Sequence, residues 1–236
     1  RVLVGLLDPH APKVDSFAAE LMLRSTNSLL DAPGARGCLL FGPGAGTDAR
    51  ARAALYRALA ASVPLVLDAD GLNLLAAAES ELHTLLQQRT APSILTPHPL
   101  EAARLLACTV DAVQADRLQA ARDLARRYAA WVVLKGRGTV ISSPQLNLWI
   151  NATGNGLLAT AGSGDVLAGA IAALISATSN AACVPAAVWL HGRAADLFFA
   201  HHGDAGLCAA DLPYWIARAW NEVPTPAAPG TMTSFE

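Results

Sequence analysis

GCLLFGPGAGTDARARAALYRALAA, residues 37–61, contains the three parts of a strand–turn–helix unit. Its first five residues are a short apolar run that predicts a buried strand, and residues 42–47 form a glycine-rich turn. Asp48 follows as an N-cap candidate for a helix over 48–61, in which apolar residues recur at helical spacing. A strand that leads through such a turn into a helix is typical of an α/β fold.

The same succession of short apolar runs and longer helical runs continues on both sides of this unit. It predicts βαβ units, and the 53 % hydrophobic and 15 % charged residues suit a sheet that is buried on both faces by helices. We therefore expect a three-layer α/β/α sandwich with a mainly parallel central sheet. Strands are predicted over residues 2–7, 37–41, 64–68, 93–96 and 131–135, and helices over 48–61, 72–86, 99–106 and 112–130.

The pattern changes after residue 137. Two extended runs, 138–143 and 145–150, flank a Ser-Pro turn and predict a hairpin. A glycine-rich stretch and three helices follow, over about 165–176, 182–201 and 209–220, with no strand between them. We expect these helices to close one side of the sheet, with His191 packed inside one of them.

Composition and charge exclude several classes of protein. The net charge is −2 and the Arg residues are scattered, so there is no basic stripe for nucleic acid. The four cysteines form no CxxC pair, which fits a cytoplasmic protein without a zinc site. The most apolar stretch, about 166–177, is too short to span a bilayer. We expect one domain over 1–222 and a flexible Pro-rich tail over 223–236, in a chain that can be part of a longer protein.

The strongest local signal is NATGNGLLATAGSGD, residues 151–165, which leads directly into an apolar helix. Gly162 and Gly164 let the backbone approach a ligand closely, and the free N–H groups of the first helical turn then point at it. A phosphate placed there meets the positive end of the helix macrodipole. Asp165 would lie beside it, where a substrate hydroxyl could be deprotonated. The alternative is that Asp165 is only an N-cap.

A second glycine-rich turn, KGRGT at 135–139, lies between two predicted strands. Its two glycines and its small hydroxyl residue could let the backbone wrap a nucleotide's phosphate or ribose, and Lys135 would supply charge. The alternative is an ordinary hairpin turn with a solvated lysine.

Three further turns each follow a predicted strand, so all should lie at the carboxyl edge of the sheet, where ligands bind in open α/β folds. The turn at 42–48 is either a ligand contact or a rigid turn with a capping Asp. Asp70 either positions a polar substrate or stabilises a turn. In TPHPLE, residues 96–101, His98 could contact substrate and Glu101 could contact water around a metal ion, although a single histidine is more often structural.

Taken in order, five motifs resemble those of the ADP- or ATP-dependent NAD(P)H-hydrate dehydratases of the ribokinase-like superfamily. They are GPGAGTD (42–48), LDADGLNLL (67–75), LTPHPLEAARLL (95–106), LKGRGTVI (134–141) and NGLLATAGSGDVLAG (155–169). The resemblance runs from about residue 20 to residue 203. Many sugar and vitamin kinases of the superfamily carry Asn-x-x-Glu where this chain has His98-x-x-Glu101, which favours the dehydratases.

The resemblance implies a ribokinase-like fold and a repair reaction on hydrated NADH or NADPH. ADP or ATP, with Mg²⁺, would phosphorylate the ring hydroxyl, and loss of phosphate would restore the cofactor. Asp165 would be the base, and backbone N–H groups would stabilise the transferring phosphoryl group. The residues implied for the nucleotide are Lys135, Gly136, Arg137, Gly138, Thr139, Gly162, Ser163 and Gly164, and those for the hydrated dinucleotide are Gly44, Gly46, His98 and Asp165.

The resemblance also implies a homo-oligomer, a tetramer in this family, and fusion to or cooperation with an NAD(P)H-hydrate epimerase. Two departures qualify the match. Ala161 and Ser163 stand where the family more often has Gly and Thr. The family's opening strand and its substrate loop are not visible ahead of Arg1, so the sheet can lack its first strand. A vitamin-precursor kinase of the hydroxyethylthiazole or pyridoxal type and a catalytically silent nucleotide-binding module remain the alternatives.

Overall fold

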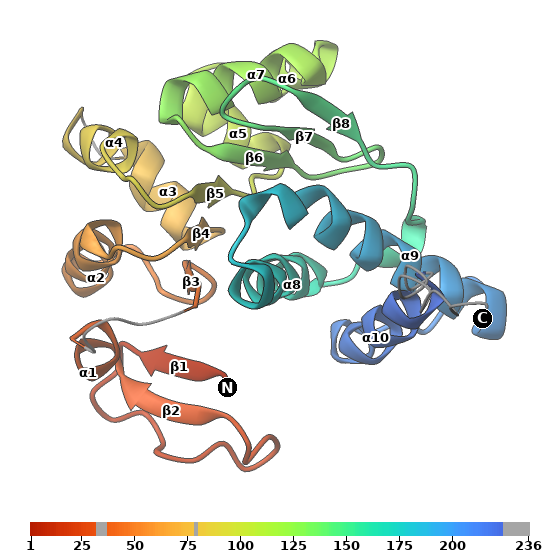
Figure 1. Ribbon diagram of the computed structural model, residues 1–236, viewed down its shortest axis with the longest axis horizontal. Coiled ribbons are helices and arrows are strands. Elements are labelled where there is room, and N and C mark those ends of the chain that lie inside the picture. The colour runs from red at the N-terminus through yellow and green to blue at the C-terminus, as the bar shows by residue number, and fades with distance from the viewer. Residues whose placement is uncertain (32–36, 78–79, 224–236) are drawn as a thin grey trace, which may run out of the picture.

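The computed structural model describes residues 1–31, 37–77 and 80–223. Its main sheet has six strands in the order β3-β4-β5-β6-β7-β8 (Figure 1). Neighbours from β3 to β6 are parallel, whereas β7 is antiparallel to both β6 and β8. The predicted hairpin is therefore confirmed as β7 and β8. The strands are β3 (Leu39–Phe41), β4 (Leu65–Leu67), β5 (Ser93–Leu95), β6 (Trp131–Leu134), β7 (Val140–Ser142) and β8 (Leu148–Ile150).

Helices cover both faces of this sheet. Successive residues of a strand point to opposite faces, and in the central strands the residues on both faces are apolar and buried. In β4, Leu65 and Leu67 belong to one buried cluster and Val66 belongs to another. The helices of the first layer are α2 (Ala49–Ala60), α3 (Asp70–Ala77), α4 (Ser80–Gln87), α5 (Pro99–Leu106), α6 (Val110–Ala115) and α7 (Arg117–Tyr128). The opposite face packs on α8 (Ser163–Thr178) and α9 (Val184–His202). The expected three-layer α/β/α sandwich is confirmed.

The predicted run of three C-terminal helices is confirmed as α8, α9 and α10 (Leu212–Glu222). Only the first two of them cover the sheet. The third helix, α10, packs on α9 through a separate cluster that includes Phe198, Leu212 and Trp215. Within the described ranges, no helix is both long and apolar enough to cross a membrane.

Two predicted helices are each divided in the structure. The helix predicted over 72–86 is α3 followed by α4, and the one predicted over 112–130 is α6 followed by α7. In the second case Asp116 is the dividing residue, because its side chain accepts a hydrogen bond from the Gln119 N–H and caps α7. An Asp inside a helical pattern can end one helix and start the next because it competes for backbone N–H groups.

The N-terminal segment differs most from the prediction. The strand expected over 2–7 exists as β1 (Leu3–Leu6), but it pairs with β2 (Met22–Ser25) in a separate two-stranded parallel sheet. β2 and the short helix α1 (Thr26–Leu30) were not predicted. No residue of β1 is buried, so this strand does not fit a sheet covered on both faces. Arg57 of α2 joins the segment to the main domain by donating to Asn27 at 2.7 Å.

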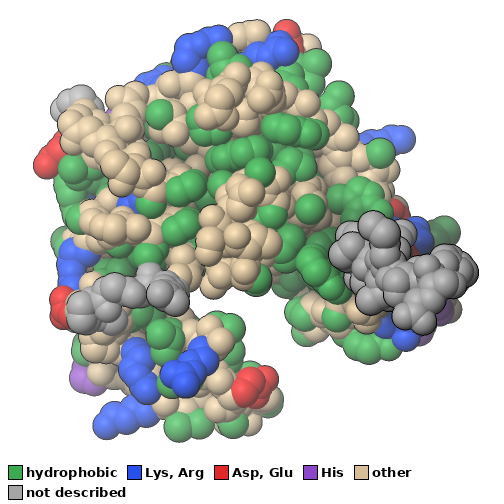
Figure 2. All heavy atoms as spheres, viewed as in Figure 1, with side chains coloured by type: hydrophobic (Ala, Val, Ile, Leu, Met, Phe, Trp, Pro, Cys, Tyr) green, Lys and Arg blue, Asp and Glu red, His purple; other side chains and the backbone are tan. Residues whose placement is uncertain are grey.

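Basic side chains form separate groups on the surface. In Figure 2 they gather over the N-terminal segment below and over the helices at the top, with hydrophobic and neutral surface between them. Residues 224–236, which make up nearly all of the predicted tail, lie outside the described residues.

Candidate active site at the carboxyl edge of the sheet

The ends of β4, β5 and β6 bring three of the sequence motifs together. The Lys135 N–H, just after β6, donates to the Pro97 carbonyl at 2.8 Å, just after β5. The Thr96 N–H donates to the Leu67 carbonyl at 3.1 Å, at the end of β4. These hydrogen bonds fix Asp68, His98 and Lys135 at one edge of the sheet, because parallel strands all end on the same side.

A buried ion pair joins two of these motifs. The Lys135 Nζ lies 2.7 Å from the Asp68 Oδ1, and the two side chains are 18 % and 2 % exposed. Lys135 is therefore not the solvated lysine of an ordinary hairpin turn. A Cβ added to Gly164 would lie 3.3 Å from the Lys135 Nζ, so the ammonium also lies next to the first turn of α8. Lys135 thus connects β4, the turn after β6, and the start of α8.

The start of α8 is open to a ligand. Its N-cap is Gly162, which has φ +84° and provides no side-chain cap for the helix. Asp165 is the third residue of the helix, so the interpretation of Asp165 as an N-cap is wrong. Its side chain is exposed, and it has no hydrogen-bond or ion-pair partner among the residues that the structure describes. Uncapped N–H groups at a helix N-terminus attract anions, and a free carboxylate stands beside them.

Side chains of helix α9 hold the start of α8 and the glycine-rich stretch before it in place. The His191 Nε2 lies 2.9 Å from the Ser163 carbonyl oxygen, and burial lowers the pKa of His191 to about 4. A neutral His191 that donates from Nε2 fits both observations. Asp196, which sequence reasoning missed, accepts from the Gly154 N–H at 2.9 Å and from the Asn155 side chain at 3.0 Å. The sequence signal that could have identified Asp196 is a charged residue within the mostly apolar run of α9.

The turn at 42–48 is held by Asp70. The Gly46 N–H donates to the Asp70 Oδ2 at 2.8 Å, so this carboxylate positions the turn. Gly44 and Gly46 have φ +65° and +72°, and a Cβ on either would have no neighbour within 4 Å, which leaves open space beside the turn. Asp48 caps α2 by accepting from the Ala51 N–H at 2.9 Å, as predicted.

His98 and Glu101 contact each other. The His98 Nδ1 accepts from the Leu100 N–H at 3.1 Å and caps α5, while Glu101 accepts from the His98 N–H at 2.8 Å. The second Glu101 oxygen lies 3.2 Å from the His98 Nε2. Burial raises the pKa of Glu101 and lowers that of His98. His98 therefore has a structural role, yet its side chain is 45 % exposed at the edge of the site.

The turn at 135–139 has positive φ angles at both of its glycines. Gly136 and Gly138 have φ +136° and +63°, and the Thr139 hydroxyl donates to the Gly136 carbonyl at 2.9 Å. Arg137 is exposed and has no acidic partner among the described residues. Arg117 of α7 donates to two carbonyl groups at the start of the turn, and sequence reasoning missed it because the two segments are far apart in the chain.

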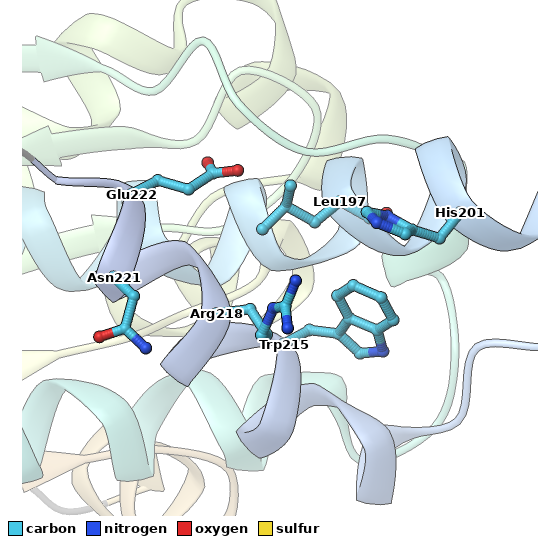
Figure 3. Close-up of a pocket in the computed structure, with 6 residues that line it drawn as sticks. All are labelled: Leu197, His201, Trp215, Arg218, Asn221 and Glu222. Atoms are coloured by element: carbon cyan, nitrogen blue, oxygen red, sulfur yellow. The ribbon is translucent and has the colours of Figure 1, made fainter.

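Two hollows lie elsewhere. One, of about 300 Å³, lies between α9 and α10 and is lined by Leu197, His201, Trp215, Arg218, Asn221 and Glu222 (Figure 3). The other, of about 630 Å³, is lined by residues of the N-terminal segment and α2. Neither includes a residue of the edge described above. We therefore identify the candidate site by its chemistry, because among the described residues neither hollow combines an uncapped helix N-terminus with a carboxylate that has no partner. The described residues contain no group of three or more metal-ligating side chains.

Comparisons with known proteins agree with the motifs. A family model described as NAD(P)H-hydrate dehydratase matches residues 7–217. The chain is 48 % identical over 153 residues to the ADP-dependent (S)-NAD(P)H-hydrate dehydratase of Neisseria meningitidis, a match that covers 63 % of this chain and 50 % of that protein. It is 43 % identical over 175 residues to the bifunctional NAD(P)H-hydrate repair enzyme Nnr of Vibrio cholerae, which covers 74 % of this chain and 34 % of that enzyme. The chain thus spans between a third and a half of the length of these curated relatives.

Solved structures show the same likeness. The chain superposes on the ADP/ATP-dependent NAD(P)H-hydrate dehydratase of Bacillus subtilis, co-crystallised with ATP and Mg²⁺ and soaked with CoA, with a TM-score of 0.77. The identity is 31 %, over 87 % of this chain and 74 % of that one. A hydroxyethylthiazole kinase from Pyrococcus horikoshii gives a TM-score of 0.62 at 17 % identity, covering 86 % of this chain and 80 % of that one, which shows the fold alone.

Proposed function

The chain belongs to the NAD(P)H-hydrate dehydratase family, and from that premise we propose that it uses ADP or ATP to dehydrate the hydrated form of NADH or NADPH. The observation that carries the proposal is the start of α8. There the free Asp165 carboxylate stands on an uncapped helix N-terminus, and Lys135 joins that terminus to the turn at 135–139. A proton acceptor, an anion-binding backbone and a nucleotide turn are three of the parts that phosphoryl transfer to a hydroxyl needs, and Mg²⁺ is the fourth.

The reaction then follows in two steps. Asp165 accepts the proton of the hydroxyl on the hydrated nicotinamide ring, and that oxygen attacks the terminal phosphoryl group of the nucleotide. The leaving group is AMP when ADP is the phosphoryl donor, and ADP when ATP is the donor. Phosphate is next expelled from the ring carbon as the neighbouring carbon loses a proton, which restores the ring double bond. Stabilisation of the phosphoryl group by the N–H groups of Gly162 and Gly164 lowers the barrier of the first step. The Ser163 N–H would join them only by leaving the Thr160 carbonyl, to which it donates at 3.3 Å.

The remaining site residues have binding roles in this proposal. The backbone of residues 135–139 holds the nucleotide phosphates or ribose, and Arg137 adds positive charge. Gly44, Gly46 and His98 contact the hydrated dinucleotide, which the open space beside the first two and the exposure of His98 support. Because Asp70 already occupies the Gly46 N–H, the contact at that turn would use its other backbone groups.

Mg²⁺ would be bound chiefly by the nucleotide phosphates and water, since this ion keeps much of its hydration shell in such sites. The carboxylates at the edge fit that arrangement. Asp68 is paired with Lys135, and both Glu101 oxygens face His98. Glu101 would therefore contact the ion through water. The chemistry that Mg²⁺ supplies is neutralisation of the phosphate charge.

The broader expectations are part of the same proposal. Residues 1–222 act as one catalytic domain of a cytoplasmic homo-oligomer, a tetramer, that works with an NAD(P)H-hydrate epimerase. Light scattering after size exclusion gives the oligomeric state. Limited proteolysis tests whether 1–222 resists cleavage as one unit.

The decisive assay incubates the protein and Mg²⁺ with the hydrated cofactor and either ADP or ATP, and follows the absorbance of the reduced nicotinamide. Nucleotide-dependent recovery of absorbance is expected, with AMP or ADP and phosphate as products. The comparison of ADP with ATP identifies the preferred nucleotide. Lack of recovery with both nucleotides would refute the proposal, and a stable phosphorylated product from a vitamin precursor would favour a kinase instead.

A further inference from the structure

Arg117 reaches from α7 to the turn at 135–139. Its Nη2 donates to the Leu134 carbonyl at 3.0 Å and to the Lys135 carbonyl at 3.3 Å, and its Nη1 donates to the Gln114 side chain at 3.0 Å. The guanidinium therefore holds the last residue of β6 and the first residue of the turn. Because a guanidinium is planar and presents several donors in fixed directions, it fixes both carbonyls relative to α7.

The guanidinium also occupies the space beside Gly136. A Cβ on Gly136 would lie 3.1 Å from the Arg117 Nη1 and 3.2 Å from its Nη2, and Gly136 has φ +136°. The backbone at Gly136 thus packs directly on the charged group. An L-residue at this position would be strained and would also push the guanidinium away.

Within the described ranges, no side chain neutralises the charge of Arg117. Its hydrogen-bond acceptors are two carbonyls and an amide, all neutral, and no carboxylate pairs with it among the described residues. Arg117 is moreover the first residue of α7, where the helix macrodipole disfavours a positive charge. Burial lowers its pKa. Lys135 differs, because Asp68 neutralises it. Arg117 and Arg137 therefore supply the positive charge beside the turn at 135–139 that is still available to attract an anion.

We propose that Arg117 is a positioning residue for the nucleotide. It holds the Leu134 and Lys135 carbonyls on the side of α7, so that the N–H groups of residues 136–139 stay free for phosphate oxygens, and its charge strengthens their attraction for an anion. The inference rests on the proposed nucleotide-dependent function and adds a residue that lies outside the glycine-rich motif itself.

The test is calorimetric titration of ADP and ATP, with Mg²⁺, into the 236-residue chain and three variants. Arg117→Met removes both the hydrogen-bond donors of the guanidinium and its charge. Arg117→Lys keeps the charge but not the planar set of donors. Arg126→Met is the matched control, because Arg126 lies on the same helix, pairs with Asp123 and is exposed. We expect Kd for the nucleotide to rise at least tenfold in Arg117→Met and less in Arg117→Lys, and to change by less than twofold in Arg126→Met.

Two further readouts distinguish positioning from general stability. In steady-state assays, Arg117→Met should raise KM for the nucleotide at least tenfold and leave KM for the hydrated cofactor within twofold. Hydrogen exchange at the amides of residues 136–139 should become slower when nucleotide binds to the unmodified chain, and should slow less in both Arg117 variants at the same nucleotide concentration. A variant that loses affinity for both substrates equally would contradict a positioning role.

The outcomes separate this inference from the function on which it rests. If the unmodified chain binds neither nucleotide, the proposed function fails and the inference fails with it. If the unmodified chain binds nucleotide and a folded Arg117→Met binds it equally well, only the inference is overturned. Should Arg117→Met fail to fold, Arg117→Lys decides, since unchanged affinity and unchanged exchange at 136–139 would overturn the inference.

Discussion

The Lys135 ammonium and the Asp68 carboxylate meet at 2.7 Å across the end of β5, because Lys135 follows β6 and Asp68 follows β4. The pair links β4 and β6, the two strands on either side of β5, at the carboxyl edge of the sheet. It also sets the position of the ammonium beside Gly164 at the start of α8. One ion pair therefore aligns the turn at 135–139 with the start of α8.

Removal of Lys135 alone should destabilise the protein more than removal of both partners. Lys135→Met leaves the Asp68 carboxylate buried without a counter-ion, which typically costs about 3 kcal/mol of the free energy of unfolding. In Lys135→Met/Asp68→Asn no charge is left uncompensated, so the loss should be smaller. Urea unfolding of the two single variants and the double variant measures this. A double variant less stable than Lys135→Met would contradict the pair as described.

Asp165→Asn should lower turnover at least about 100-fold, the range for loss of a general base, because the amide cannot accept the hydroxyl proton. The Kd for ADP should stay within about threefold, since the N–H groups of α8 remain. Asp111→Asn is the control, because Asp111 is likewise an exposed acid in the first turn of a helix, α6, and has no role in the proposed mechanism. Unchanged turnover in Asp165→Asn would remove Asp165 from the proposed mechanism.

Gly162, the N-cap of α8, and Gly169, inside that helix, should respond to alanine in opposite ways. Gly162 has φ +84°, and a Cβ there would lie 3.1 Å from the Ala209 Cβ, so Gly162→Ala should destabilise the protein by about 1–2 kcal/mol. Gly169 lies inside the helix with open space around its Cβ position, so Gly169→Ala should stabilise it by about 0.5–1 kcal/mol. Thermal unfolding of both variants tests the sign. Equal changes in stability would show that the positive φ of Gly162 does not destabilise an alanine at that position.

His191 should make stability depend on pH in the acidic range. The folded protein holds its pKa near 4, whereas the unfolded chain has about 6.5, so the unfolded state binds more protons between these values. The stabilisation is complete above about pH 6.5 and is lost as the pH falls toward 4, by up to about 3 kcal/mol. Unfolding curves from pH 4 to pH 7 measure it. His191→Gln, which can still donate to the Ser163 carbonyl, should show a flatter profile over that range.

Much of the fold could be read from local patterns. The central strands, the turn-to-helix unit at 37–61, the hairpin and the three C-terminal helices were all predicted and are present. Local sequence suffices for these because a strand buried on both faces needs a continuous apolar run, and a helix start needs an N-cap such as Asp48. The divided helices and β2 were missed, since a capping Asp or a four-residue strand barely alters the hydrophobic pattern.

The sequence by itself determined which segments would lie at the carboxyl edge, because strands joined through a turn and a helix run parallel and therefore end on the same side of the sheet. Only the tertiary structure decided which side chains meet there. Asp68 pairs with Lys135 while Asp70, two residues later, holds Gly46, because Ala69 has φ +46° and the chain reverses between them. The contacts of Arg117, His191 and Asp196 likewise join segments far apart in the chain. Such pairings depend on how whole helices pack on the sheet, which no local pattern of residues contains.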